Sequence, residues 1–537
     1  MASAIPNRYG LEQTLASAIA HRFGTTVVPA ENDAGADNCL LVTDPAILDS
    51  LTRFLFWDAG CSFGGLIVEE RDQWNLRYIF LTPSSGWVHF LLRVPLGTRS
   101  VPSISANLHA ADWYEREAED LFGLEFEEHP RLGDFILHDQ VWHEGIAPMR
   151  KAFHPLQQQS ERRPQLDWRP RLVVQDPGSF AMPVGPVYEG GAGESVHFLL
   201  ETVGEDVIRA LPRLFYNYRA VEKIAEGKAV PDVLLLAERF AAKSAFAHSL
   251  AFCQAVENAS RAEVPPRARH LRVLLCELER LRHHAGAIAG ICQSTALSVA
   301  AAHAGMIEEQ LLRASCEFAG HRYLFGLNAP GGLYRDFDRE SCKRLLHAVD
   351  NAASELRLLQ ERLRYSSSFL DRLEDVGVVN FDSARDLDLL GPVGRASGIL
   401  ASDLRRACPY SGYERYEFDT ACEADGDGYA RLRVLFSEAG QSARLILQAV
   451  ESLEAGEIRV PIGDVACTEA SGWVEAPIGA AVHWLRLGGE GRVERYRILS
   501  PSFRNWLGLH VAAEDFAFQD FPIILATFAL SAAECDR

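Results

Sequence analysis

Four long segments carry apolar residues three and four positions apart, and this pattern limits the fold more than any other feature of the chain. The segments are residues 209–227, 244–263, 269–290 and 342–373. Such spacing places the apolar side chains on one face of a helix, and that face must be buried against other elements. The centre of the chain is therefore predicted to be a large helical body.

Strand signals flank this body on both sides. Residues 25–130 contain short alternating apolar runs separated by turn sequences, and strand signals return at residues 416–436 and 473–501. Residues 154–172 are rich in proline, glutamine and arginine, as in an extended linker. The predicted fold class is α+β, with a small α+β domain at residues 1–155, a linker at 156–184 and a mainly helical domain with flanking strands at 185–537.

The charge and cysteine content exclude several classes of protein. The chain has 537 residues, with 53 lysines and arginines against 73 aspartates and glutamates, and its net charge of −20 argues against nucleic-acid binding. The eleven cysteines form no C-x-x-C motif, which predicts buried, reduced thiols in a reducing compartment. The N-terminus lacks the apolar stretch of a secretory signal.

One uncharged segment raises the question of a membrane span. Residues 285–307 contain no aspartate, glutamate, lysine or arginine, but they are mostly alanine, glycine and serine. Two closely packed helices of small residues explain this composition better than a transmembrane helix does. Attachment to a membrane is therefore expected to come from other subunits.

Residues 112–123 read D-W-Y-E-R-E-A-E-D-L-F-G, which combines charged and aromatic side chains. Taken alone, this pattern is also typical of a solvated helix face on which charges three and four apart support the helix. Together with H-P at 129–130 and R-K-A-F-H-P at 150–155, however, it resembles the signature of the C subunit of bacterial complex I, the NADH–quinone oxidoreductase.

Further strings between residues 185 and 537 are similar to the D subunit of complex I and to the large subunit of NiFe hydrogenases. They include E-R-F-A-A-K-S-A-F-A-H, N-A-P-G-G-L-Y-R-D and V-E-A-P-I-G-A-A-V-H-W. The resemblance implies a fusion of C and D subunits, as in the large subunit of energy-converting and formate-hydrogenlyase-type hydrogenases.

In the hydrogenases of this family, two C-x-x-C motifs supply four thiolates to the nickel–iron centre, because soft sulfur ligands suit these metals. This chain has other residues at the four corresponding positions, namely Ala241, Ser244, Ser531 and Glu534. Cys535 lies one position away, and the arginine of the A-P-R-G motif is replaced by Ile478. The resemblance therefore implies that this chain has no metal of its own and no hydrogenase activity.

The D subunit of complex I holds the quinone head group with a histidine and a tyrosine. This chain has Tyr188 near the histidine position and Ala242 near the tyrosine position. Because a reduced quinone needs proton donors beside its oxygens, Tyr188, Tyr218 and His248 are candidate substitutes. A quinone site on this chain is therefore one expectation.

Other family positions keep charged side chains. Glu194 aligns with a glutamate that relays protons beside the hydrogenase metal, although an exposed hairpin carboxylate explains it equally well. With His248, the residues Arg335 and Asp336 complete the candidate catalytic set. Arg335 and Asp336, together with Arg395 and Asp403, are expected to form an internal charge network, since buried charges persist only when they are paired.

Two functions remain open from the sequence. The first is a redox subunit of a complex-I-like or energy-converting-hydrogenase-related complex, which couples electron transfer, with a quinone as a candidate acceptor, to ion translocation. The second is a non-catalytic scaffold or coupling subunit. In both, the implied partners are an iron–sulfur protein like the B subunit, which would carry the clusters, and membrane subunits resembling antiporters and the H subunit. The chain itself is expected to lie on the cytoplasmic face of the inner (plasma) membrane. An NAD-binding enzyme is a weaker third interpretation, because no G-x-G-x-x-G follows a strand.

Overall fold

The computed structural model describes residues 13–30, 39–83, 86–139, 141–142, 145–154, 178–186, 195–463, 465 and 468–537. Tyr188, Glu194 and most of the predicted linker lie outside these residues. The predicted boundaries at 155 and 185 therefore stay predictions. The described end of the linker region forms strand β8 (Ser179–Val184), which pairs with β9 (His197–Val203).

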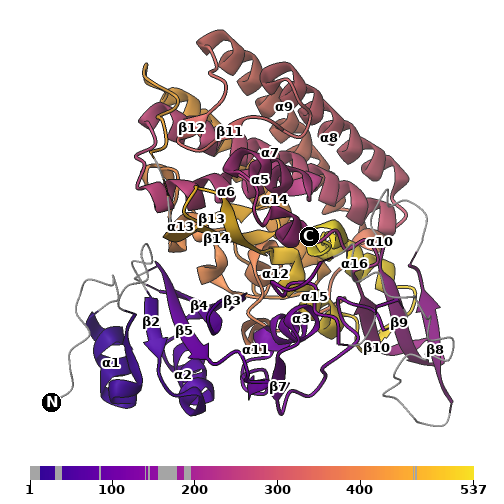
Figure 1. Ribbon diagram of the computed structural model, residues 1–537. Helices are drawn as coiled ribbons and strands as arrows, with labels where there is room; N and C mark the ends of the chain where they lie inside the picture. The colour runs from indigo at the N-terminus through magenta and orange to yellow at the C-terminus, as the bar shows by residue number, and fades with distance from the viewer. Residues whose placement is uncertain are drawn as a thin grey trace.

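The N-terminal unit is a five-stranded sheet with short helices (Figure 1), in the order β1-β2-β5-β4-β3. Among the described pairings of this sheet, only β2 and β5 run parallel. Every residue of β4 is buried, so both faces of the sheet are covered, because alternate side chains point to opposite faces. The elements are α1 (Gln13–Phe23), β1 (Val27–Pro29), β2 (Cys39–Val42), α2 (Leu48–Arg53), β3 (Ser62–Glu70), β4 (Trp74–Thr82), β5 (Gly86–Val94), β6 (Ser100–Pro102), α3 (Asp112–Phe122) and β7 (Glu125–Glu127).

Long helices form the body of the C-terminal unit, as the apolar spacing predicts. Helix α7 packs between α14 and α8, and α9 lies across α8 and α14 (Figure 1). The helices are α4 (Val221–Ala225), α5 (Val230–Arg239), α6 (Ala245–Ser260), α7 (Pro266–Ser294), α8 (Ser298–Ala319), α9 (Arg339–Leu363), α10 (Ser367–Leu370), α11 (Phe381–Asp386), α12 (Gly391–Ala396), α13 (Leu404–Ala407), α14 (Gly428–Glu451), α15 (Pro501–Ala512), α16 (Phe521–Phe528) and α17 (Ala532–Cys535).

Three further sheets complete this unit. One has the order β16-β10-β9-β8, one is the meander β13-β14-β15, and one is a short hairpin. The meander packs against α6, so it places strand side chains beside the helical body. The remaining strands are β10 (Asp206–Arg213), β11 (Asn328–Ala329), β12 (Gly332–Leu333), β13 (Thr468–Ala476), β14 (Gly479–Leu487), β15 (Val493–Leu499) and β16 (Phe516–Ala517).

Two segments differ from their predicted secondary structure: only residues 221–225 of the predicted helix 209–227 are helical, and no residue of the predicted strand region 416–436 forms a strand. Residues 209–213, predicted as helix, belong to β10, where Pro212 disfavours a helix and pairing with β9 supplies the backbone hydrogen bonds. Residues 428–436, predicted as strand, begin α14, because the side chain of Asp427 accepts the amide hydrogen of Ala430 at 2.6 Å and starts the helix. Both errors fall where a cap or a partner strand outweighs the local pattern.

The uncharged segment is divided between two helices, as predicted. Helix α7 ends at Ser294 and α8 begins at Ser298. None of the helices that the structure describes combines the length and the apolarity needed to cross a membrane.

The charged helix α3 does not present a solvated face, which corrects the alternative interpretation of residues 112–123. Glu115 and Glu117 are buried, and Glu117 lies at the boundary between the two units. Its carboxylate accepts hydrogen bonds from Arg497 and from Arg537, the latter at 2.8 Å, and both arginines also contact Glu222. The motif of α3 therefore anchors one unit to the other.

Two more buried clusters cross the same boundary. Arg77 pairs with Glu469 at 2.8 Å, and Arg486 pairs with Glu69 at 2.9 Å. Asp388 accepts hydrogen bonds from the hydroxyl of Ser62, the backbone amide of Phe63 and the guanidinium of Arg504. We call these three groups, including the one at Glu117, the interface clusters.

Candidate functional site

The two segments that hold thiolates in NiFe hydrogenases come together in this fold. Ser244, just before α6, donates a 2.8 Å hydrogen bond from its hydroxyl to Oε1 of Glu534 in α17, although 290 positions separate them. Both side chains are buried. The fold thus brings the hydroxyl of Ser244 and the carboxylate of Glu534 into direct contact.

Glu534 has hydrogen-bond donors at both carboxylate oxygens. His248 Nε2 lies 3.0 Å from Oε1, and the backbone amide of Ser502, in the first turn of α15, donates to Oε2 at 3.1 Å. Burial by itself raises the pKa of Glu534, but the hydrogen bonds and charge of His248 outweigh burial and hold this pKa below its usual range. The carboxylate is therefore ionised at neutral pH.

A chain of buried polar groups extends away from Glu534. His248 Nδ1 lies 2.9 Å from His483 Nε2 on β14, and His483 Nδ1 lies 2.6 Å from the hydroxyl of Tyr496 on β15. Burial, together with the charges of His248 and Arg537, lowers the pKa of His483 well below its ordinary value. Burial also raises the pKa of Tyr496 well above its ordinary value. Both side chains are therefore neutral at pH 7.

One arrangement of protons gives every donor in this chain an acceptor. Tyr496 donates to His483, His483 Nε2–H donates to His248, and His248 Nε2–H donates to the Glu534 carboxylate. All bonds then point toward Glu534, so the four groups form one continuous hydrogen-bonded chain. We call these four residues the Tyr–His–His–Glu chain.

The other two thiolate positions have structural contacts. Ala241 is buried in an apolar cluster. The Ser531 hydroxyl accepts the amide hydrogen of Glu534 at 3.3 Å and caps α17. The thiol of Cys535 lies 3.6 Å from the carbonyl oxygen of Ser531. A methyl group, two hydroxyls and a carboxylate whose oxygens already have partners do not provide the soft ligands that a nickel–iron centre requires.

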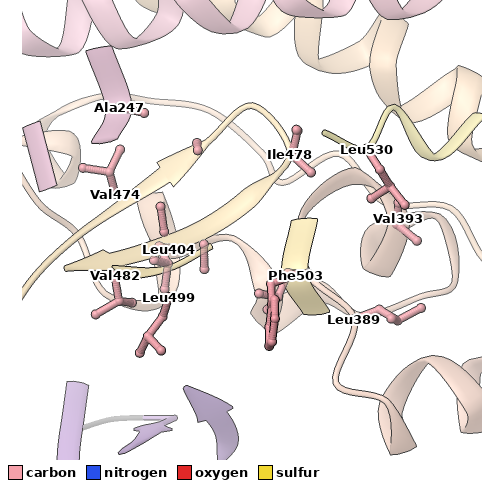
Figure 2. Close-up of a cluster of buried hydrophobic side chains, with 14 of the residues drawn as sticks. Ala247, Leu389, Val393, Leu404, Val474, Ile478, Val482, Leu499, Phe503 and Leu530 are labelled. Atoms are coloured by element: carbon pink, nitrogen blue, oxygen red, sulfur yellow. The ribbon is translucent and has the colours of Figure 1, made fainter. Parts of the chain in front are cut away.

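Ile478 lies at the turn between β13 and β14, among buried apolar side chains that include Leu530 and Val393 (Figure 2). It is 2% exposed. The backbone carbonyl of Ile478 also approaches Gly391 so closely that a Cβ at position 391 would lie 1.9 Å from it. An arginine has no polar environment here, so this turn serves packing.

Across the part of the chain that the structure describes, no three or more His, Cys, Asp or Glu side chains are grouped so that they could hold a metal ion. Within the Tyr–His–His–Glu chain each group contacts the next, and Glu534 also accepts hydrogen bonds from Ser244 and from the amide of Ser502. The polar atoms of Glu534 and His248 are therefore already paired within the protein.

The other predicted site residues are placed apart from this chain. Arg335 and Asp336 are exposed, and Asp336 pairs with Arg267 at 2.9 Å, so neither lies beside the buried His248. Tyr218 is half-buried and packs edge-on against Phe215. Its quinone role, like the catalytic roles of Arg335 and Asp336, stays a prediction.

Tyr188 and Glu194 lie outside the described residues. The structure therefore brings together Ser244, His248, Ser531 and Glu534 from the predicted set. Sequence reasoning missed His483 and Tyr496. The available signal was a histidine within the otherwise apolar run of β14, where a buried polar group needs a partner.

Of the four residues predicted to form an internal charge network, Arg395 and Asp403 are buried and paired, whereas Arg335 and Asp336 are exposed, so the prediction was wrong for the latter two. Arg395 pairs with Glu438 at 2.6 Å and with Glu475 at 2.9 Å, while Arg405 pairs with Asp403 at 2.9 Å. All five side chains are fully buried. Burial alone raises the pKa of Glu438, but the charge of Arg395 and the other neighbours hold it well below its usual range. This network fastens α12, α13, α14 and β13 to one another.

Comparison with known families assigns both parts of the chain. Residues 41–159 match the family described as the 30 Kd subunit of respiratory-chain NADH dehydrogenase. Residues 300–471 match the family described as the 49 Kd subunit of the same enzyme.

Several curated proteins are similar over most of the chain. Formate hydrogenlyase subunit 5 of Escherichia coli K12 is 28% identical over 491 residues, which cover 89% of this chain and 85% of that protein. The D subunit of the NADH-quinone oxidoreductase of Akkermansia muciniphila is 30% identical over 382 residues, which cover 66% of this chain and 92% of that protein. The C/D subunit of the NADH-quinone oxidoreductase of Methylococcus capsulatus is 27% identical over 510 residues, which cover 84% of this chain and 83% of that protein. The chain belongs to the complex I family of fused C/D subunits, which includes related hydrogenase subunits.

Proposed function

We propose that this chain is a peripheral-arm subunit of a membrane-bound oxidoreductase complex related to complex I and to energy-converting hydrogenases. In this proposal it has no nickel–iron centre, and the complex couples electron transfer to ion translocation. The names of its relatives support this assignment, since they are subunits of NADH-quinone oxidoreductase and formate hydrogenlyase.

The observation that carries the proposal is the hydrogen bond between Ser244 and Glu534. It joins two positions that hold thiolates in the hydrogenases, and it engages the carboxylate that stands in place of one thiolate. A metal at this point would have to displace Ser244, His248 and the amide of Ser502 from Glu534. Hydrogenase chemistry is therefore not expected.

Within this proposal the Tyr–His–His–Glu chain handles protons. Reduction of a quinone consumes two protons, and general acids must deliver them in hydrogen-bond contact with the acceptor. His248 is the proposed donor residue, and Tyr188 and Tyr218 are the proposed contacts for the quinone head group. Glu194 is retained as a proposed proton relay.

We assign the cofactors to partner subunits. Iron–sulfur clusters would lie in a protein like the B subunit, and membrane subunits resembling antiporters and the H subunit would hold the chain at the cytoplasmic face of the membrane. A quinone is the candidate acceptor.

A non-catalytic scaffold is the second candidate function. It is favoured by the complete internal pairing of Glu534, His248 and His483, whose hydrogen-bonding atoms all have partners within the chain. A side chain whose hydrogen-bonding atoms are all paired inside the protein has no free atom to bind a substrate unless one of its partners moves away.

Purification of the native membrane complex tests both candidates. Quinone reduction, ion transport and metal content are measured on the same sample, for the wild type and for variants Tyr188→Phe, His248→Gln and Glu534→Gln. The surface histidine variant His303→Gln is the control, because His303 pairs only with Glu355 at the protein surface. Quinone turnover that falls in the site variants but not in the control, without nickel, supports the redox subunit.

Other outcomes contradict parts of the proposal. Ion transport without electron transfer to any quinone would support the scaffold. Stoichiometric nickel bound to this subunit would show that the oxygen-based site does hold a metal and would overturn the proposal.

A further inference from the structure

Helices α9 and α14 enclose a surface groove whose lining includes no residue of the Tyr–His–His–Glu chain. Its volume is about 630 Å³. The floor is apolar, with Leu346, Val349 and Ala353 on α9 and Phe436, Gly440 and Ala443 on α14. Nothing in the assigned functions uses this groove.

The groove has the dimensions of a short helix. Its lining runs from Leu346 to Gln360 along α9 and from Phe436 to Leu447 along α14. At about 1.5 Å per residue, these stretches are roughly 21 and 16 Å long, which matches a helical segment of about 11 to 14 residues. Lining residues recur every three or four positions on both walls, so the walls are ridges between which a third helix can pack.

The floor allows close approach of a backbone. A Cβ added at Gly440 would meet only the Nη1 atom of Arg444, at 3.8 Å, so the space above this residue is open. Gly440 and Ala443 lie one helical turn apart, and small residues at this spacing let a facing helix come near.

The rims carry positive charge that the chain itself does not neutralise. Arg357 on α9 and Arg444 on α14 are exposed, and neither forms an ion pair with another residue in the part of the chain that the structure describes. Elsewhere the chain is acidic, with a net charge of −20. The lining also contains one exposed acidic residue, Asp350, so the two arginines leave the groove net positive, which favours an acidic partner over a basic one.

We propose that this groove binds an amphipathic α-helix of a partner protein. The apolar face of that helix packs on the floor, and its acidic side chains pair with Arg357 and Arg444. A helix fits better than a lipid chain, because the polar side chains of Ser354 on α9 and Ser437 on α14 interrupt the apolar walls. The inference does not depend on the proposed redox function.

Photo-crosslinking in the native complex tests the proposal. The photoreactive residue p-benzoylphenylalanine replaces Ala353 or Ser437 within the groove, or the exposed Asn351 outside it, and crosslinked peptides are identified by mass spectrometry. We expect both groove positions to label one segment of another protein. That segment should carry apolar residues three and four apart, with Asp or Glu beside them. The position outside the groove should not label it.

Charge reversal separates the groove from general electrostatics. In the variant Arg357→Glu/Arg444→Glu the crosslink yield should fall about tenfold, which corresponds to about 1.4 kcal/mol. The control Arg362→Glu/Arg364→Glu makes the same change of net charge at exposed positions near the end of α9 and should leave the yield unchanged. Circular dichroism verifies that both variants are folded.

Three crosslinking results would overturn the proposal. They are crosslinks between two copies of this chain, an equal loss of yield in both charge variants, and labelled segments without amphipathic helical spacing. Vesicles of phosphatidylglycerol probe the lipid alternative, and binding of these vesicles that requires both arginines, without a protein crosslink, would also overturn it.

Discussion

Two buried glutamates are held in different ways in this protein. Glu117, at the boundary between the units, is bound by the guanidinium groups of Arg497 and Arg537. Glu534, at the position of a hydrogenase thiolate, is bound by a serine hydroxyl, a histidine and a backbone amide. Both carboxylates are withdrawn from water, so the difference lies in their partners.

The partners determine what each carboxylate can do. A guanidinium keeps its protons at any physiological pH, so the cluster at Glu117 is a fixed ion pair that holds the units together. Glu534 is instead held by the hydroxyl of Ser244, the ring of His248 and the amide of Ser502. The comparison teaches that this fold buries a carboxylate either in a guanidinium cluster, as at the interface, or in a network of hydrogen bonds.

The largest expected effect comes from breaking the interface cluster at Glu117. The variant Glu117→Leu leaves two arginines sharing only Glu222, so we expect a loss of about 3–5 kcal/mol in the free energy of unfolding. Urea denaturation measures it. The exposed pair of Arg22 and Asp58 provides the control, since Arg22→Met should cost less than about 1 kcal/mol. Equal losses in the two variants would mean that the cluster is not structural.

A smaller effect is expected at Glu534. The variant Glu534→Gln keeps the shape but removes the charge, so hydrogen bonds to a charged group worth about 1.5–3 kcal/mol are weakened. Because the folded-state pKa of Glu534 lies below its usual range, the carboxylate contributes stability above the unfolded-state pKa, and this stability is lost as the pH falls through the folded-state pKa. The difference in the free energy of unfolding between wild type and variant should therefore shrink as the pH is lowered. A difference that persists at acid pH would contradict this reasoning.

Glu115 is expected to show the opposite dependence on pH. Burial raises its pKa to about 7, and no arginine pairs with it among the described residues, although Ser103 and the amide of Ile104 donate to it. Its ionisation therefore costs stability as the pH rises from the unfolded-state pKa toward 7. As the pH rises from 5 to 8, the free energy of unfolding of the variant Glu115→Gln should increase relative to that of the wild type by on the order of 1–2 kcal/mol. Unfolding measurements at these two pH values would show no such gain if the residue is ionised throughout.

The smallest effect concerns the partly exposed pair of His109 and Asp386, which also crosses the boundary between the units. The hydrogen bond that His109 donates to Asp386 raises the pKa of His109, so the contribution of this pair to stability is present below the unfolded-state pKa and is lost as the pH rises through the folded-state pKa. Nuclear magnetic resonance titration should give a lower pKa for His109 in the variant Asp386→Asn. Because the pair is exposed, the stability should change by less than about 1 kcal/mol, and a pKa that does not move would rule out the pairing.

Much of the helical body could be predicted because its signal is local. The apolar spacing at residues 244–263, 269–290 and 342–373 coincides with α6, α7 and α9. The prediction was wrong for β10 and for the beginning of α14, where a partner strand and a capping aspartate outweigh the pattern. These contributions come from residues outside the local apolar pattern.

The candidate site was only partly predictable. Aligned motifs identified Ser244, His248 and Glu534 as members of one site, and the structure brings them into contact. His483 and Tyr496 were missed, because a strand's sequence does not reveal which helix its polar residue faces. Arg335 and Asp336 match family motifs but lie on the surface, since motif position does not determine burial.

The sequence by itself determined the family and the helical body, because these depend on residue identity and short-range spacing. The tertiary structure alone decided which polar groups surround Ser244 and Glu534. A buried carboxylate forms an ion pair or a hydrogen-bonded network according to which groups long-range folding brings within about 3 Å of it. At Glu117 these groups are guanidiniums, and at Glu534 they include an imidazole.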